Sequence, residues 1–225
     1  MGINLTLFLL AVKMKKVAVF VDWDNLRNTI EDLQRVTERR EFNYNEPRHL
    51  SKLFKCFLND DEEFYRIYIY TAEHLTIPQI ESHLNSALKD KFQKFLAKNI
   101  DYEKKIEVAN TFLKNIVKED HIALRTGKMI VNGLKASGYP NLAQKQVDML
   151  LGLDISHIAH MSLADNILIF SKDTDMIPAM KVARINGLSV VIANFAESNH
   201  ISEGLVKHTD VMRTKSFISD IIPAL

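Results

Sequence analysis

The chain has 225 residues, of which 25% are charged and 47% hydrophobic, and its formal net charge is +1. This composition excludes a disordered, collagen-like or membrane-embedded chain, and the near-neutral charge argues against a histone-like nucleic-acid binder while leaving room for a local basic surface. The single cysteine, Cys56, excludes an internal disulfide and a cysteine-rich zinc site, and it is typical of a reducing compartment. We therefore predict a cytoplasmic protein.

Residues 1–13 contain an apolar run that superficially resembles an export signal. No positive charge precedes the run and no small-residue cleavage site follows it. The run is also too short to span a bilayer, which takes about 20 residues. We predict no membrane association, an N-terminal extension over 1–14 that is either dispensable or packed as an extra strand or helix, and one domain over 15–225.

The first elements follow from two kinds of periodicity. A continuous valine, alanine and phenylalanine run is typical of a strand buried on both faces of a parallel sheet. Leu26, Ile30 and Leu33 then recur at helical spacing, after an Asp and Asn start that can cap free amides. The predicted order is strand 17–22, helix 24–36, helix 45–58 and strand 64–72.

The segment from Pro78 to about Lys118 has helical periodicity without a glycine or a further proline. It predicts a pair of antiparallel helices, inserted over about residues 76–119. Between Lys89 and Lys118 there are eight lysines against four acids, which is compatible with a surface that follows an RNA backbone. The flanking acids reduce this excess, so a solvated face on a structural insertion is favoured.

The second half of the chain alternates between extended and helical patterns. Residues 121–133 are extended, 142–161 helical, 166–170 an apolar strand, 176–186 helical and 188–195 a further strand, with a short helix and strand over 201–215 and a tail helix over 216–225. Strands that alternate with helices predict a mainly parallel sheet covered on both faces, a three-layer α/β/α domain.

Acidic side chains directly follow two of the predicted strands. Asp22 ends the first apolar run, and Asp173 and Asp175 follow the strand NILIF. Because the ligand crevice of an open parallel sheet lies outside the carboxyl ends of its strands, these carboxylates crowd together if the two strands are neighbours. Such like charges are costly unless a cation or protons compensate, and a hard divalent cation such as Mg²⁺ takes oxygen ligands. The sequence therefore predicts a divalent cation site.

A further carboxylate is expected from the segment KQVDMLLGLD. On the predicted helix Lys145 and Asp148 are three residues apart and share one face. Asp154 lies six residues after Asp148, about 240° round a helix of 3.6 residues per turn. One straight helix cannot direct both aspartates into one site, so we favour Asp148 for the acidic cluster and place Asp154 near the helix end or in support of the loop.

Three segments resemble, in this order, the signature segments of the NYN family of PIN-like nuclease domains, specifically its bacterial LabA/DUF88-like branch: VAVFVDWDNL, KQVDMLLGLD and ILIFSKDTDMIPAMKVARINGLSVVI. The likeness covers most of residues 15–215. The positions that match the family patterns are Asp22 and Asn25 in the first segment, Lys145, Val147, Asp148 and Asp154 in the second, and Ser171, Asp173, Asp175 and Pro178 in the third.

The resemblance implies a PIN-like domain that hydrolyses RNA phosphodiester bonds with Mg²⁺ or Mn²⁺, DNA being a further possible substrate. The metal ligands and catalytic groups that it implies are Asp22, Asp148, Asp173 and Asp175, with Asn25 as a hydrogen-bonding partner. The substrate contacts assigned with them are Lys145, Ser171, Lys172 and Thr174.

The third segment departs from the family pattern at two positions. Lys172 stands where the family has glycine, and Met176 stands where it has phenylalanine. The lysine side chain changes how a phosphate approaches, and it can itself contact one. Trp23 is open between stacking on a base and packing against a neighbouring loop.

Two other functions are open. FVDWDN is also similar to the Asp-x-Asp motif of haloacid dehalogenase-type phosphotransferases, with Asp22 as nucleophile and Asp24 as general acid, but Leu26 replaces the Thr or Val that follows there. The other is a catalytically silent PIN-like RNA-binding or regulatory protein that keeps its acidic pocket, in which Asp22 serves as a helix cap. A homo-oligomer is possible in either case, through the helical insertion or the tail helix.

Overall fold

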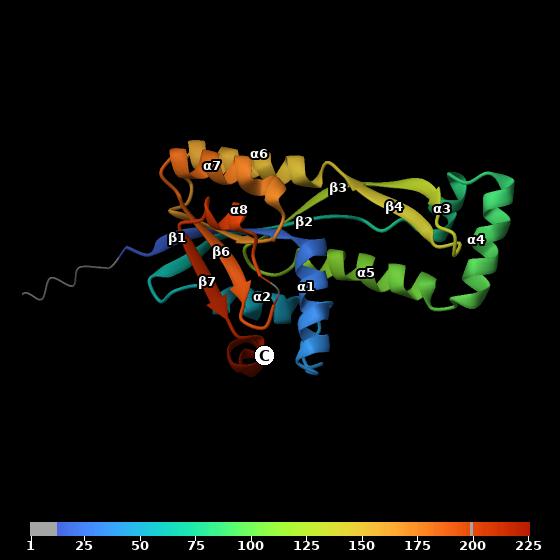
Figure 1. Ribbon diagram of the computed structural model, residues 1–225, viewed down its shortest axis with the longest axis horizontal. Coiled ribbons are helices and arrows are strands. Elements are labelled where there is room, and N and C mark those ends of the chain that lie inside the picture. Colours follow the sequence, from blue (N-terminus) through green and yellow to red (C-terminus); the bar gives the residue numbers. More distant parts are fainter. Residues whose placement is uncertain (1–12, 199) are drawn as a thin grey trace, which may run out of the picture.

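The computed structural model describes residues 13–198 and 200–225 (Figure 1). Within these residues, seven strands form one sheet in the order β4-β3-β2-β1-β5-β6-β7, and all neighbouring pairs are parallel except β3 with β4. The strands are β1 Lys15–Asp22, β2 Glu62–Ala72, β3 Ile122–Leu134, β4 Pro140–Lys145, β5 Asn166–Phe170, β6 Ser189–Phe195 and β7 Val211–Lys215. The predicted mainly parallel sheet is confirmed.

Strand β1 lies at the centre of the sheet, between β2 and β5. Its residues from Val17 to Val21 have no exposed surface. Val17, Val19 and Val21 pack into the core on one face of the sheet, and Ala18 and Phe20 pack into the core on the other. This burial on both faces explains the uninterrupted apolar run, and it puts the next residue at the carboxyl edge of the sheet.

Helices cover both faces of the sheet and complete the three-layer α/β/α architecture that was predicted (Figure 1). One face carries α1 Trp23–Val36, α2 Pro47–Cys56, the end of α5 Tyr102–Ile116 and the C-terminal turns η2 Phe217–Ile221 and η3 Ile222–Ala224. The other face carries α6 Val147–His160, η1 Thr174–Met176, α7 Ile177–Ile185 and α8 Glu203–Val206. The predicted tail helix is thus a π-helical turn followed by a 3₁₀ turn.

The predicted antiparallel helix pair is in fact three helices, α3 Ile77–Ser82, α4 Ser86–Lys98 and α5. Helix α4 runs across the far end of α5 and does not lie alongside it (Figure 1). Phe92, Phe95 and Tyr102 form a small core of their own with Ile80 and Ile106, separate from the two cores on the sheet. We call α3, α4 and the first half of α5 the arm. Val131 and Leu134, near the far end of the β3–β4 hairpin, pack against it.

The predicted helix over 142–161 was wrong in its first part. Residues 140–145 form β4, which pairs antiparallel with β3, and the helix begins only at Val147. Gln146 turns the chain between them with a left-handed φ of 74°. The turn brings the end of β4 so close to Gly127 that a Cβ there would lie 2.4 Å from the Lys145 carbonyl oxygen. Hydrogen bonding to β3, the preceding strand of the hairpin, therefore overrides the local helical pattern.

Residues 1–12, which hold most of the predicted N-terminal extension, lie outside the described residues. In the part of the chain that the structure covers, no helix is long and apolar enough to cross a bilayer.

Candidate active site

Asp22 is the last residue of β1 and also caps the helix that follows. Its Oδ1 accepts a hydrogen bond from the backbone N–H of Asn25 at 3.2 Å, which satisfies a free amide in the first turn of α1. Its Oδ2 accepts a hydrogen bond from the Ser171 hydroxyl at 3.4 Å. The capping role and the site role therefore coexist in one carboxylate.

Strand β5 delivers the second acidic segment beside Asp22, because Phe170 pairs with Val21 and the two strands end together. The Ser171 hydroxyl also accepts a hydrogen bond from the backbone N–H of Asp173 at 3.1 Å. On the same loop, the Lys172 N–H donates to the Asn25 side-chain oxygen at 3.2 Å. Ser171 and Asn25 therefore join the ends of the two strands and fix where Asp22 and Asp173 stand.

The third carboxylate, Asp148, comes from the first turn of α6, which packs on the face of the sheet opposite to α1. Asp148, Asp173 and Asp175 line one small cavity with Gly152 and Met176. Partial burial and the negative charges of Asp173 and Asp175 raise the pKa of Asp148. Helix α6 thus supplies an acid to the two strand ends, as the sequence predicted for Asp148 and not for Asp154.

The cluster is electrostatically strained in the absence of a cation. The pKa of Asp22 is raised from 3.8 to about 6, mainly by burial and also by the negative charges of Asp24, Asp148 and Asp173, while the hydrogen bond from the Asn25 N–H acts in the opposite direction. A group whose ionised form is disfavoured by burial and by like charges gains most from a bound cation. This is the pattern expected of a cation site.

The donor chemistry fits a hard divalent ion that keeps much of its water. Asp22, Asp148 and Asp173 offer carboxylate oxygens, the ligand type that Mg²⁺ and Mn²⁺ prefer. Among the residues that the structure describes, no three His, Cys, Asp or Glu side chains are grouped closely enough to hold a metal ion by themselves. Mg²⁺ in proteins is usually held by one or two carboxylates, together with water and substrate phosphate. The residues therefore fit an ion of that kind.

The four residues assigned to the substrate take different positions. Thr174, at the start of η1, and Lys145, at the end of β4, are exposed. Ser171 is buried and binds within the cluster, and the Lys172 ammonium donates to the Ser198 hydroxyl at 3.1 Å. Burial lowers the pKa of Lys172. The prediction that Lys145 shares a helical face with Asp148 was wrong, because Lys145 belongs to strand β4.

Asp154 was predicted near the helix end or in support of the loop, and this was wrong: it lies in the middle of α6 and makes a structural contact. Its Oδ2 accepts hydrogen bonds from the Tyr70 hydroxyl and from Arg125 Nε, each at 2.9 Å. Tyr70 is on β2 and Arg125 on β3, so this carboxylate ties α6 to the sheet. Neither partner could be identified from the sequence, since each lies on a segment far from residue 154.

The first turn of α1 contributes two more residues whose roles the sequence left open. The Asp24 carboxylate accepts a hydrogen bond from the Gln144 amide of β4, and it lines a groove beside the site. Trp23 is buried and stacks on Phe112, with ring centroids 4.7 Å apart. Trp23 therefore packs in the core and is not available to a base.

The three-layer α/β/α fold has a mainly parallel sheet, with acids at the carboxyl ends of the adjacent strands β1 and β5 and at the start of α6. Together these features define a PIN-like α/β domain. The family model described as NYN domain matches residues 16–215, so the chain belongs to the NYN domain family. Proteins of this family are generally nuclease-like. The LabA/DUF88-like branch stays a prediction.

No curated protein sequence matches the chain. Among solved structures, it is similar to the crystal structure of a protein of unknown function from Vibrio parahaemolyticus, with 14% sequence identity and a TM-score of 0.46 over 90% of this chain and 93% of that one.

Proposed function

We propose that this protein is a ribonuclease that hydrolyses RNA phosphodiester bonds with the help of Mg²⁺ or Mn²⁺. The observation that carries the proposal is the convergence of Asp22, Asp148 and Asp173 from two adjacent strand ends and a helix start, in a chain of the NYN family. A cytoplasmic location, which the single cysteine predicts, belongs to the same proposal.

The ion would be held by oxygens of Asp22, Asp148 and Asp173, and Asp175 lines the same small cavity as Asp148 and Asp173. When bound, it activates a water for attack on phosphorus and neutralises the charge that develops on the phosphate oxygens. Asn25 and Ser171 keep the carboxylates in place through the hydrogen bonds described above. No protein nucleophile is needed for this reaction.

The remaining contacts orient the phosphate. Thr174 and Lys145 are exposed, and in this proposal they contact a backbone phosphate, Thr174 by its hydroxyl and Lys145 by its charge. Lys172 is assigned a less direct role, because its ammonium donates a hydrogen bond to the Ser198 hydroxyl. Its backbone N–H donates to the Asn25 side-chain oxygen and so helps to hold the loop that follows β5.

The test is a cleavage assay of the purified chain on labelled single-stranded RNA, structured RNA and DNA of matched sequence, in Mg²⁺, in Mn²⁺ and in EDTA. We expect RNA cleavage with metal and none with EDTA. Asp22→Asn and Asp173→Asn should each reduce the rate by on the order of 100-fold or more, the scale of losing one group that stabilises developing charge. Asp120→Asn, an exposed aspartate just before β3, is the matched control and should cleave normally.

Cleavage that survives both Asp22→Asn and Asp173→Asn would place the chemistry elsewhere. RNA binding without cleavage in any metal would instead support the regulatory alternative, and preferential cleavage of DNA would correct the substrate class.

A further inference from the structure

A groove of about 840 Å³ extends from Asp24, two residues after Asp22, into the arm. At one end it is lined by Asp24 and Arg27 of α1, and the charge of Asp24 acts on Asp22. From there it runs between α5 and the β3–β4 hairpin to Phe95, Tyr102 and Tyr139. Pockets of roughly 300–1,000 Å³ hold whole small ligands, so this groove has room for a nucleotide.

The far end of the groove presents an aromatic surface. The Tyr139 ring, on a residue that is 42% exposed, meets the buried rings of Phe95 and Tyr102 edge-on, with centroids 5.6 and 5.7 Å away. Lys135 Nζ lies 5.5 Å from the centre of the same ring. The two buried rings hold Tyr139 in place and leave it accessible, which is the arrangement on which unpaired bases stack.

The groove carries more positive than negative charge, although the chain as a whole is almost neutral. Its cations are Arg27, Lys98, Lys105 and Lys135, and its carboxylates are Asp24 and Asp101. Burial lowers the pKa of His74, so this histidine adds no charge at neutral pH. Two of the lysines assigned above to a solvated face, Lys98 and Lys105, therefore line a concave surface in which a phosphate backbone would find opposite charge.

Arg27 supplies an unsatisfied donor at the end of the groove nearest the acids. Its Nε is buried and has no hydrogen-bond partner within the described part of the chain. Buried donors are nearly always paired in folded proteins, and a guanidinium pairs particularly well with phosphate oxygens. Arg27, the aromatic surface and the lysines therefore line one groove, which also includes Asp24, two residues after Asp22.

We propose that this groove binds a single-stranded stretch of nucleic acid next to the scissile bond, with a base stacked on Tyr139 and phosphates on Lys98, Lys105 and Arg27. The identification of that strand as RNA rests on the proposed function. A duplex does not offer the unpaired base that Tyr139 needs, and an apolar peptide helix would leave the lysines and the Arg27 Nε without partners. The arm is then the part of the protein that selects single-stranded substrate.

The test measures binding in EDTA, where the proposed cleavage cannot occur. Fluorescence anisotropy of a labelled single-stranded RNA oligonucleotide is recorded over a series of salt concentrations, for the full chain and its variants. Tyr139→Ala should raise the Kd by about 5-fold to 150-fold, the range for losing one stacked base, while Tyr139→Phe should leave it unchanged. The double variant Lys98→Gln, Lys105→Gln should lower the slope of log K against log salt by about 1.4.

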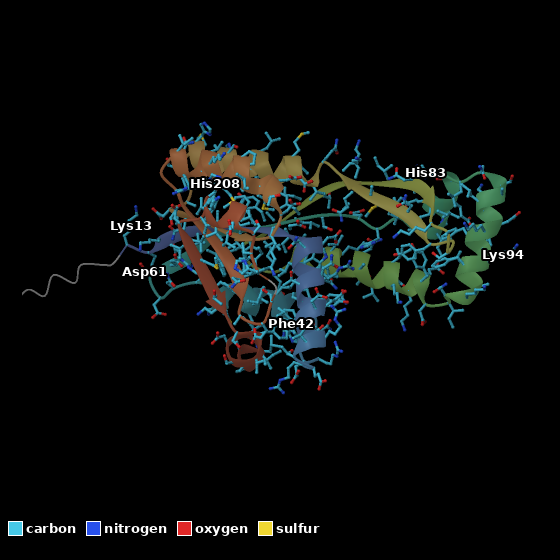
Figure 2. The ribbon with its side chains drawn as sticks, viewed as in Figure 1. Lys13, Phe42, Asp61, His83, Lys94 and His208 are labelled. Atoms are coloured by element: carbon cyan, nitrogen blue, oxygen red, sulfur yellow. The ribbon has the colours of Figure 1, made fainter. Side chains whose placement is uncertain are left out.

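A matched control changes two lysines on the same helices that do not line the groove, Lys94→Gln with Lys104→Gln. Figure 2 places Lys94 at the outer end of the arm. This control should bind RNA as the parent does. Equal losses in the two double variants, or an unchanged Kd in Tyr139→Ala, would overturn the proposal. So would competition by a polyglutamate peptide or a duplex as effective as that by single-stranded RNA.

The two proposals fail in different ways. If RNA is cleaved but the groove variants bind and cleave as the parent does, the groove assignment falls and the ribonuclease stands. If RNA is never cleaved in any metal but binding depends on Tyr139, the groove stands without the enzyme.

Discussion

Replacing Asp22 with asparagine should stabilise the protein while disabling the proposed reaction. The amide has the same shape, and its oxygen can still accept the hydrogen bond of Asn25 N–H. The pKa of Asp22 is raised from 3.8 to about 6, and one pKa unit corresponds to about 1.36 kcal/mol. Keeping this carboxylate ionised above pH 6 therefore costs the folded state about 3 kcal/mol, a cost that the neutral amide avoids.

The sign of the pH dependence follows from proton counting. Between pH 3.8 and about 6 the folded chain holds a proton on Asp22 that the unfolded chain has lost, so the wild-type free energy of unfolding falls as the pH rises through this window. The asparagine variant lacks this contribution. The stability gained by Asp22→Asn should therefore be small near about pH 4 and reach about 3 kcal/mol near about pH 7.5.

Urea denaturation of both proteins in EDTA across this pH range measures the difference directly, and contributions from carboxylates that do not interact with Asp22 cancel in it. Added Mg²⁺ should stabilise the wild type and leave the Asp22→Asn variant unchanged, because only an ion that binds the folded state shifts the equilibrium. Asp120→Asn again serves as the control, with no pH-dependent gain. A stability difference that stays constant from acid to neutral pH would refute the argument that Asp22 is held at an electrostatic cost.

Three further substitutions test how the fold supports the site. Asp154→Asn should cost about 1–2 kcal/mol of stability, by losing its charged hydrogen bond to Arg125, yet retain RNA cleavage in a direct assay; an inactive but stable variant would make Asp154 part of the site. Gly127→Ala should destabilise the protein by about 1–3 kcal/mol, seen as a lower melting temperature, and should also slow RNA cleavage, because the added Cβ would displace the start of α6. A wild-type melting temperature and cleavage rate would contradict this. Arg213→Met leaves the buried Glu62 carboxylate without its ion pair and should cost about 3–5 kcal/mol in urea denaturation, partly recovered on adding Glu62→Gln; no recovery would mean that packing dominates.

Sequence alone determined the centre of the fold and the edge of the sheet at which the predicted site acids lie. The run from Val17 to Val21 is apolar at every position because both of its faces are buried, and that burial is the property that a sequence pattern reports. A strand end in a parallel sheet has a fixed location, so Asp22 and Asp173 could be assigned to one edge before any coordinates were known.

Tertiary structure decided what depends on which segments pair and pack with one another. Residues 140–145 became a strand because β3 offers hydrogen bonds to them, against their own helical pattern, and this moved Lys145 off the helix that carries Asp148. Asp154 found Arg125 and Tyr70 across the sheet.

The groove likewise exists only because the arm folds back over the β3–β4 hairpin. Periodicity in a sequence records whether each residue is buried, which is largely a local property. It does not record which partner a residue is buried against. In this protein the pairing of β3 with β4 sets where α6, the helix of Asp148, begins, and the packing of the arm on the hairpin creates the groove.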